Sequence, residues 1–369
     1  MASNPRAATA RSGGAGTAVR TGRAVVMVGK EFQIREYEVP EPAPGTLLLR
    51  QELSGICGTD LHNWEYQRLS GDILLGHENV GVVEKLGQGV ERDYLGQPIK
   101  PGDRLVFAPA ASGGAYGFFE ADEAPHFRGG FADYIYLAQP DTCFIKTSLP
   151  AEAAVLAEPF QVGVHGVMRS QLKFGDTVVV QGSGPIGLMT LIAARAGGAG
   201  RLIVVGGPKG RLEKARTLGA DVTIDIGEVK EPAERTRIVR EQTPRGEGAD
   251  VVFECAGFLG AITEGLGYLR RSGTYVEMGH FVDVGSLQLN PNHELMRRNL
   301  RLEAVWGGGG ADIFVRAHQV MSRGDVPFAD LVDPILPLER VAEGFEALHS
   351  GYRLAGKDVL KVALRSGRG

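Results

Sequence analysis

Residues 177–197 read TVVVQGSGPIGLMTLIAARAG and combine three local patterns in one short stretch. The β-branched run TVVVQ predicts a buried strand, and LMTLIAARAG predicts a helix. Between them, Gly182, Gly184 and Gly187 form the spacing G-x-G-x-x-G. In a strand–turn–helix context the first glycine allows the tight turn, the second lets backbone approach a pyrophosphate, and the third lets helix and strand pack closely. We therefore predict a dinucleotide-binding turn here, rather than a glycine turn without a ligand.

The residues around this turn continue the alternation of strand and helix. Strand-like runs are separated by helical segments in the order TVVVQ, RLIVV, VTIDI, ADVVFE, TYVEM and LRLEAVW. Such alternation is typical of an α/β doubly wound parallel sheet, in which the helix after the first strand points its N-terminus at the phosphates. Pro185 and Ile186 lie at that N-terminus, and we include both in the predicted cofactor-binding turn.

The end of the second strand bears on which dinucleotide is bound. An NAD site places an acid about 20 residues beyond the glycine turn to hold the ribose 2′-hydroxyl. Here RLIVV is followed by GGPKGR, which starts at Gly206 and contains no acid. Small residues leave room for a 2′-phosphate, with which Lys209 or Arg211 would pair. The sequence favours NADP over NAD, although Arg211 would equally suit a solvent-facing start of the next helix.

The remainder of the chain is organised differently. Residues 24–150 contain short β-like runs such as AVVMV, TLLLRQEL, RLVFAPA and FADYIYL, punctuated by glycine and proline. This pattern predicts a β-rich, barrel-like domain. A length of 369 residues fits two domains. The final 60 residues or so return to mixed character, and we expect them to pack against the first domain.

Composition excludes several classes of protein. The chain is 43% hydrophobic without an apolar run long enough to span a membrane. Its formal charge of −4, with no long basic stretch, argues against a nucleic-acid partner. Three scattered cysteines are too few for a disulfide framework, so we expect a cytoplasmic protein. Residues 1–23 contain four arginines and no acid, and we interpret them as a disordered tail rather than a transit peptide.

A second group of motifs predicts a metal site. Cys57 lies in GICGTDLH, His77 in GHE and Glu158 in AEP. Thiolate, imidazole and carboxylate together suit zinc, and three protein ligands leave a fourth position open, which is typical of a catalytic site. Each residue alone would more often be structural, because a lone buried cysteine usually packs as a small apolar group. Their occurrence beside a dinucleotide turn favours the metal.

In this order and spacing, GICGTDLH, GHENVGVVEKLG, PGDRL, AEP and GSGPIG resemble the zinc-dependent medium-chain alcohol dehydrogenases, and most closely the sorbitol and threonine dehydrogenase branch. The resemblance implies a GroES-like catalytic domain made of residues 24–158 and 303–369, with a Rossmann domain inserted as residues 159–302. The implied reaction transfers a hydride between NAD(P) and a secondary alcohol, polyol or amino alcohol, or the matching carbonyl compound. We expect a homodimer or homotetramer.

The resemblance also implies roles for individual residues. Cys57, His77 and Glu158 match the catalytic zinc ligands. Glu78 matches the neighbouring acid that can exchange with water on the metal. Asp60 matches the carboxylate that orients the ligand histidine, a support that ligating imidazoles generally need.

Thr59 matches the hydroxyl that contacts the substrate oxygen, and His62 the outer histidine of a proton relay. The alternatives are a turn hydroxyl for Thr59 and a surface imidazole for His62. Trp64, Phe118 and Phe119 are candidate walls of the substrate pocket, with core packing as the alternative for each.

One region departs from the family pattern. Many members bind a structural zinc through four closely spaced cysteines after the PGDR motif, where this chain has none. The polar residues available there are Glu120, Asp122, Glu123 and His126. We expect them to be solvated, and therefore predict one zinc per chain. The competing interpretations are a zinc-free quinone or enoyl reductase and a non-catalytic dinucleotide-binding relative.

Overall fold

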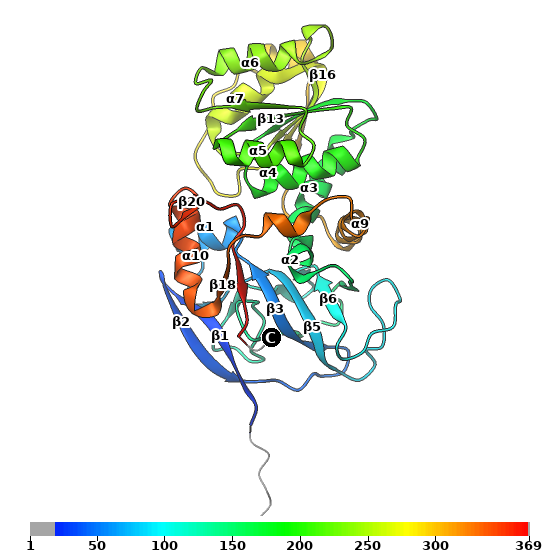
Figure 1. Ribbon diagram of the computed structural model, residues 1–369, viewed down its shortest axis with the longest axis vertical. Coiled ribbons are helices and arrows are strands. Elements are labelled where there is room, and N and C mark those ends of the chain that lie inside the picture. The colour runs from blue at the N-terminus through cyan, green and yellow to red at the C-terminus, as the bar shows by residue number, and fades with distance from the viewer. Residues whose placement is uncertain (1–18, 368–369) are drawn as a thin grey trace, which may run out of the picture.

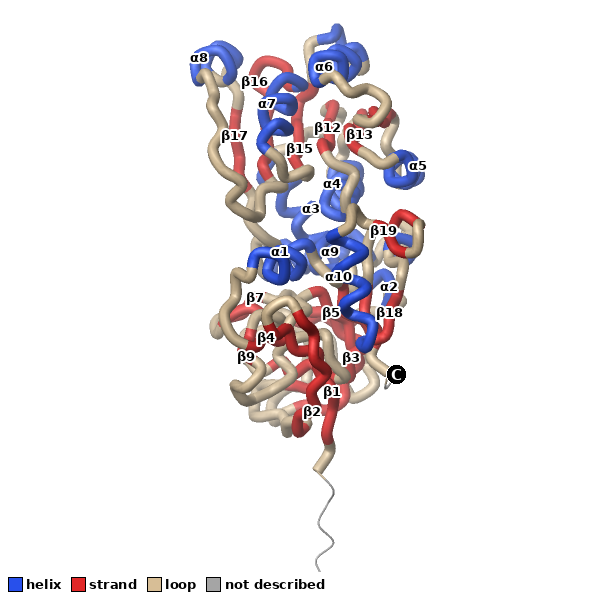
Figure 2. The backbone as a smooth tube through the Cα atoms, turned by 90° about the vertical axis from the view of Figure 1, so that its left-hand side faces the viewer, coloured by secondary structure: helices blue, strands red, loops and turns tan. Residues whose placement is uncertain are grey.

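The computed structural model describes residues 19–367 and shows two lobes stacked along the long axis of the molecule (Figure 1). The lower lobe is rich in β-strands and contains the start and the end of the described chain. The upper lobe alternates strands and helices. Both views of the backbone show the lobes meeting along one boundary, which we call the waist (Figures 1 and 2). The predicted fold class, a GroES-like β domain with a Rossmann domain, is confirmed.

The lower lobe is built on two separate sheets, and many of their strands are short. A four-stranded antiparallel sheet has the order β2-β1-β4-β9, and a larger sheet has the order β11-β6-β5-β3-β21-β18 with β10 also paired to β3. The strands are β1 (Thr21–Val28), β2 (Glu31–Glu38), β3 (Leu47–Gly55), β4 (Asp72–Leu74), β5 (Glu78–Leu86), β6 (Arg104–Phe107), β9 (Phe119–Glu120), β10 (Tyr134–Leu137), β11 (Phe144–Lys146), β18 (Ile335–Pro337) and β21 (Ala363–Arg365).

The first strand begins inside the segment predicted as a tail. Residues 1–18 of that prediction lie outside the described part of the chain, but residues 21–23 belong to β1. Arg23 is held by Asp133, whose Oδ1 lies 3.0 Å from Arg23 Nη2. Gly22 packs so closely on the Tyr134 ring that a Cβ there would lie 2.8 Å from it. These long-range contacts order residues that have no local structural signal.

The upper lobe contains a six-stranded sheet in the order β14-β13-β12-β15-β16-β17, in which all pairs are parallel. All six strands overlap the runs identified in the sequence, although β16 begins at Leu269, five residues before TYVEM. The bounds are β12 (Thr177–Gln181), β13 (Arg201–Gly206), β14 (Val222–Asp225), β15 (Ala249–Glu254), β16 (Leu269–Glu277) and β17 (Arg301–Ala304). The expected boundary between residues 302 and 303 falls within β17, because pairing with β16 continues to Ala304.

Helices cover both faces of this sheet and connect it to the lower lobe. They are α3 (Ala157–Ser170), α4 (Pro185–Ala196), α5 (Lys209–Thr217), α6 (Pro232–Glu241) and α7 (Leu259–Tyr268). Helix α3 packs on both α4 and α9 (Ala311–Met321) and carries one hydrophobic core across the waist. Among the described residues, no helix is long and apolar enough to cross a membrane.

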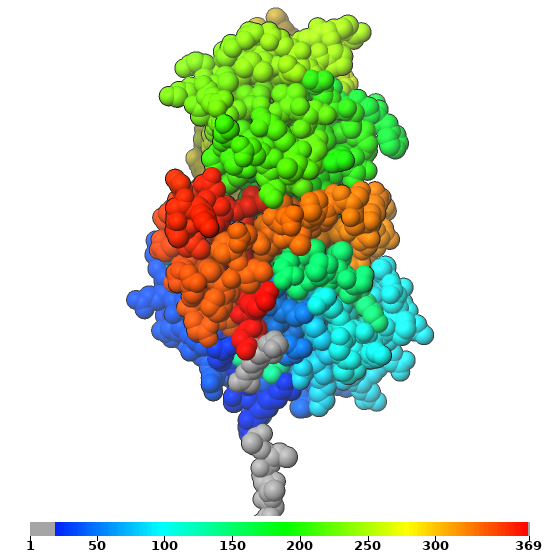
Figure 3. All heavy atoms as spheres, in the orientation of Figure 1, coloured from blue at the N-terminus to red at the C-terminus, as the bar shows by residue number. Residues whose placement is uncertain are grey.

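The end of the chain returns to the lower lobe. Helix α10 (Val341–His349) packs beside α1 (Gly58–Tyr66), and β21 pairs antiparallel with β3. The space-filling view shows the C-terminal residues, in orange and red, across the waist and down the lower lobe (Figure 3). This return places residues near position 361 beside residues near position 78.

Candidate active site

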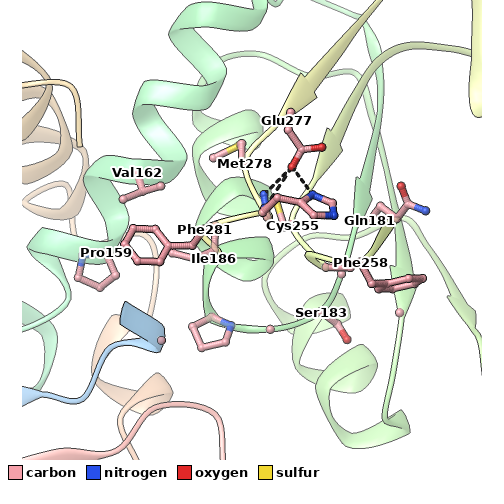
Figure 4. A pocket seen from close by; sticks show the side chains of 18 of the residues that line it. Pro159, Val162, Gln181, Ser183, Ile186, Cys255, Phe258, Glu277, Met278 and Phe281 are labelled. Carbon is pink, nitrogen blue, oxygen red and sulfur yellow. Dashed lines mark hydrogen bonds and ion pairs between the residues drawn. The ribbon is translucent and has the colours of Figure 1, made fainter. Parts of the chain in front are cut away.

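A cavity of about 740 Å³ lies at the waist and is lined by residues of both lobes. Cys57, His77 and Glu158 line it from the lower lobe and from the start of α3, and the glycine turn after β12 lines it from the upper lobe. The structure therefore brings the predicted metal ligands and the predicted dinucleotide turn to one cleft. Figure 4 shows the part of this cavity next to Ile186 and Phe281.

Local structure fixes the direction of the first two candidate ligands. Cys57 is the extended residue that precedes α1, and its backbone N–H donates to Asp60 Oδ2 at 2.9 Å. His77 follows Gly76, whose φ of 97° lies in the left-handed region. A Cβ on Gly76 would also lie 2.6 Å from the Phe131 ring, so only glycine fits this turn. Asp60 Oδ1 lies 3.4 Å from His77 Nδ1, which matches the orienting role predicted for Asp60.

Two buried carboxylates adjoin these residues. Glu78 begins β5 with no exposed surface, and Lys361 Nζ donates to its Oε1. Glu158 lies in the first turn of α3, and its Oε1 accepts from Gln161 Nε2 at 3.2 Å. Burial raises the pKa of Glu158 to about 7, while His77 opposes this shift and Glu78 adds to it.

The residues fit a bound cation. Cys57, His77 and Glu78 offer ligand atoms within 4.8 Å of one another, while Glu158 lies outside this tightest group but lines the same cavity. Glu78 Oε2 is buried without a hydrogen-bond partner, although polar atoms in such positions normally have one. Burial opposes charge on His77, yet Asp60 and Cys57 outweigh it and raise its pKa. The site thus favours positive charge, and its donor atoms suit zinc.

The predicted relay residues lie one helical turn apart at the start of α1. Thr59 and His62 both line the cavity, and Thr59 Oγ1 lies 3.7 Å from Cys57 Sγ. His62 is half-buried, its Nδ1 has no hydrogen-bond partner, and burial lowers the pKa of its imidazole. Both residues therefore face the cleft rather than bulk solvent.

The aromatic residues proposed as pocket walls lie elsewhere. Trp64 is buried and donates from Nε1 to Lys30 O at 2.8 Å. Phe118 stacks on His77 with the ring centroids 5.2 Å apart, and supports it from outside the cavity lining. Phe119 packs under Arg128, whose Cζ lies 3.9 Å from the ring centroid. Of the two interpretations left open by the sequence, packing rather than a pocket wall fits these residues, because none of the three lines the cavity.

The glycine turn has the geometry that the motif predicts. Gly182 has a φ of 105°, and a Cβ there would lie 2.8 Å from the Cys255 carbonyl carbon. A Cβ at Gly187 would lie 2.0 Å from Gly182 O, so the third glycine allows close packing of α4 on β12. At Gly184, the N-cap of α4, a Cβ would meet no protein atom within 4 Å. The open side of the turn faces the cavity, and α4 begins at Pro185 beside it.

Ser183 of the glycine turn is hydrogen-bonded to the segment that follows β13. Ser183 Oγ donates to Gly207 O at 2.9 Å and accepts from Gly207 N at 3.0 Å. Lys209 is the exposed first residue of α5 and is not part of the cavity lining. Arg211 does line the cavity, and its guanidinium lies 4.3 Å from the centroid of the Tyr352 ring. Burial lowers the pKa of Arg211, so this residue does not simply face solvent.

Several lining residues were not identified from the sequence. Phe281 and Trp306 follow β16 and β17, and Val162 and Met278 approach from α3 and from the end of β16. A signal was present for the two aromatics, because ligands of open α/β sheets bind beyond the carboxyl ends of the strands. Lys361 gave no such signal, since its partner Glu78 lies 283 residues earlier.

A second polar cluster lies at the carboxyl ends of β15 and β16, and its residues Glu277 and His280 line the cavity. Glu277 Oε1 accepts from His280 Nδ1 at 2.8 Å, and Glu254 Oε1 accepts from Ala256 N and Gly257 N at 2.7 and 2.9 Å. Burial and the nearby Glu277 charge raise the pKa of Glu254 to about 7. This cluster holds the loop after β15 in place.

The polar loop that replaces the family's structural zinc site is engaged in other contacts. Asp122 Oδ1 lies 3.7 Å from Arg35 Nη1, and Glu123 Oε2 lies 2.9 Å from Arg128 Nη2. His126 stacks on Tyr37 with ring centroids 4.2 Å apart. Asp122, Glu123 and His126 thus contact different partners. The prediction of one zinc per chain remains a prediction.

Comparison with known proteins identifies the family. Residues 43–147 match the alcohol dehydrogenase GroES-like domain, and residues 185–323 match the zinc-binding dehydrogenase family. The chain is 33% identical to 5-exo-hydroxycamphor dehydrogenase of Pseudomonas putida, over 89% of this chain and 96% of that protein. It is 32% identical to human sorbitol dehydrogenase, over 88% and 91% of the two chains.

A solved zinc-binding dehydrogenase from Sinorhizobium meliloti, bound to NADP, has a similar structure with a TM-score of 0.79. It is 25% identical, and the match covers 94% of this chain and 99% of that one. Family models, relatives and fold agree with the residues gathered in the cleft. The chain belongs to the zinc-dependent medium-chain alcohol dehydrogenases, in the branch of sorbitol dehydrogenase, and is an NAD(P)-dependent oxidoreductase that acts on CH–OH groups.

Proposed function

We propose that this protein oxidises a secondary alcohol, or reduces the corresponding ketone, at the waist between its lobes, with NADP as the preferred cofactor. The observation that carries the proposal is the convergence of Cys57, His77 and Glu158 with the open side of Gly184 in one cavity. The relatives act on substrates as different as sorbitol and hydroxycamphor, so they support the reaction but do not define the substrate.

In this proposal Cys57, His77 and Glu158 hold the zinc, which when bound supplies Lewis-acid polarisation of the substrate oxygen. Glu78 is the acid that can exchange with water on the metal, and in the structure it is paired with Lys361. The Thr59 hydroxyl takes the proton of the substrate hydroxyl as it passes its own proton on to His62, which releases a proton toward solvent. A half-buried His62 with a lowered pKa is neutral near pH 7 and can therefore accept that proton.

The preference for NADP rests on the segment after β13. Gly206 has no side chain to repel a 2′-phosphate, and Arg211 presents a cation to the cavity. Lys209, at the exposed start of α5, adds positive charge nearby. Asp225 on the neighbouring strand is the nearby acid, and its Oδ1 accepts from Gly227 N at 2.7 Å within its own turn. Charge-assisted hydrogen bonds from Arg to phosphate are the strong kind, and they support this choice.

A substitution of Gly206 by aspartate would be a poor test of cofactor choice. A Cβ at this position would lie 2.7 Å from Ser183 Oγ and 2.9 Å from Ser183 N, so the glycine turn itself would have to shift. Loss of binding to both NADP and NAD would then report only the disturbed turn and not the choice of cofactor. Removing the cation at Arg211 tests the same idea without that clash.

The decisive experiment measures zinc and turnover together. Cys57→Ala should remove most bound zinc and abolish alcohol oxidation, with NADP binding retained. Cys143→Ala is the matched control, because Cys143 is a buried thiol in the lower lobe away from the cavity lining. Elemental analysis should give one zinc per wild-type chain. Normal activity of Cys57→Ala, or activity that survives complete chelation, would contradict the proposal and favour a zinc-free reductase.

Other properties of the protein are proposals of the same kind. Cys57, Cys143 and Cys255 are all free thiols, which supports a reducing compartment, and we propose the cytoplasm. β17 is an edge strand with Leu302 47% exposed, and such an edge supports a homodimer or homotetramer. The partner molecule is a small alcohol or carbonyl compound, with neither nucleic acid nor membrane involved.

A further inference from the structure

The substrate end of the cavity is bordered by a column of stacked rings. Phe281 lies parallel to Trp306, with centroids 4.7 Å apart and planes at 16°. On its other side Phe281 faces His62 at 6.2 Å and 14°, and His62 in turn faces Tyr66 at 5.8 Å. The column crosses the waist, because His62 and Tyr66 come from α1 while Phe281 and Trp306 follow strands of the upper lobe.

Three further lining residues near Phe281 are apolar. In the view of Figure 4, Pro159 and Val162 lie beside Phe281, and Met278 lies above it. The proposed reaction already uses Thr59, His62 and the candidate metal ligands, and His280, which lines the cavity beside Phe281, is bonded through Nδ1 to Glu277. A second or third substrate hydroxyl would find few partners on these walls.

Trp306 is 67% exposed although it stacks on Phe281 and lines the cavity. Large aromatic surfaces of this kind at the mouth of a cleft mark sites that bind a ligand. Because the ring stacks on Phe281, it offers a flat surface at the edge of the cavity.

We propose that Phe281 and Trp306 form a specificity-determining wall, and that the substrate is a compact secondary alcohol with an alicyclic or aromatic ring rather than an acyclic polyol. This inference rests on the proposed function. The reacting hydroxyl lies toward Cys57, His77 and Thr59, while the ring packs against the wall. Each hydroxyl that a polyol buried without a partner would lower its affinity by about tenfold.

The test compares kcat/KM for cyclohexanol and xylitol in the zinc-loaded protein with saturating NADP. We expect a preference for cyclohexanol of about 100-fold or more, from two or more unpaired hydroxyls in the competitor. Trp306→Ala should reduce the preference by about tenfold or more, and Trp306→Phe should restore most of it because a ring remains. Phe258→Ala is the control: Phe258 is 52% exposed and lines the cavity beyond the glycine turn, so the ratio should not change.

A binding readout separates this inference from the proposed reaction. The chain has two tryptophans, of which Trp64 is 8% exposed and Trp306 is 67% exposed. Cyclohexanol should therefore shift the emission of the wild type to the blue, the shift should be absent in Trp306→Phe, and xylitol should give none. A shift without turnover of any alcohol would reject the proposed function and support the wall. Turnover that prefers xylitol, or a ratio unaffected by Trp306→Ala, would overturn the wall and leave the reaction intact.

Discussion

Replacing Glu254 by glutamine tests the electrostatics of the cofactor side. Glu254 ends β15 with no exposed surface, and its Oε2 approaches so closely that a Cβ on Gly279 would lie 2.2 Å from it. Glu277, Tyr275 and His280 are the ionisable groups that face it, with His280 Nδ1 at 3.5 Å and already bonded to Glu277. Burial, and then the Glu277 charge, raise the pKa of Glu254 from 4.5 to about 7.

The direction in which stability changes with pH follows from the raised pKa of Glu254. Between about pH 4.5 and 7 the folded protein binds more protons at Glu254 than the unfolded chain does, so stability falls as the pH rises. The full shift corresponds to about 3 kcal/mol at pH 8, at 1.4 kcal/mol for each unit. In Glu254→Gln the amide oxygen keeps the bonds from Ala256 N and Gly257 N, while the amide N–H₂ replaces the proton that faces Glu277.

The assay is urea denaturation followed by circular dichroism from pH 5 to 8.5. The variant should match the wild type near pH 5 and exceed it by up to about 3 kcal/mol at pH 8. Glu228→Gln, an exposed acid of the same lobe, should show no such pH-dependent difference. A difference that stays flat, or that falls as the pH rises, would refute the assignment of a raised pKa to Glu254.

Three further predictions concern the active site. Thr59→Val should lower kcat by about 100-fold or more, with partial recovery in Thr59→Ser. His62→Ala should have a smaller effect on alcohol oxidation, confined to the pH range above the lowered pKa of the imidazole, where wild-type His62 is neutral and accepts the proton; equal steady-state pH profiles would remove His62 from the relay. Arg211→Gln should reduce the ratio of kcat/KM for NADP over NAD by about tenfold, and a wild type that already prefers NAD would contradict the assignment. Lys361→Met should destabilise the protein by about 3–5 kcal/mol because it leaves Glu78 buried and unpaired, and adding Glu78→Gln should recover most of that loss in chemical denaturation.

Local sequence patterns were sufficient for the framework of this protein. The turn at Gly182, Gly184 and Gly187 follows from steric requirements that act within a few residues, so it can be identified without a fold. The same is true of the six strands of the upper lobe, since β-branched runs between helices leave few other arrangements. The motifs around Cys57, His77 and Glu158 gave candidate ligands because thiolate, imidazole and carboxylate groups have specific chemistry.

Tertiary structure decided which side chains share the cleft. Lys361 meets Glu78 only because β21 returns to pair with β3, and no local pattern encodes a contact between residues so far apart. Trp64 and Phe119 pack inside the lower lobe, whereas Phe281 and Trp306 form the wall of the cavity. The sequence does not separate these two outcomes, because contacts between the lobes place the loops that carry Phe281 and Trp306. Sequence thus determined the chemistry available to this protein, while long-range packing decided its pocket, since apolar contacts are non-directional and any aromatic can fill a core.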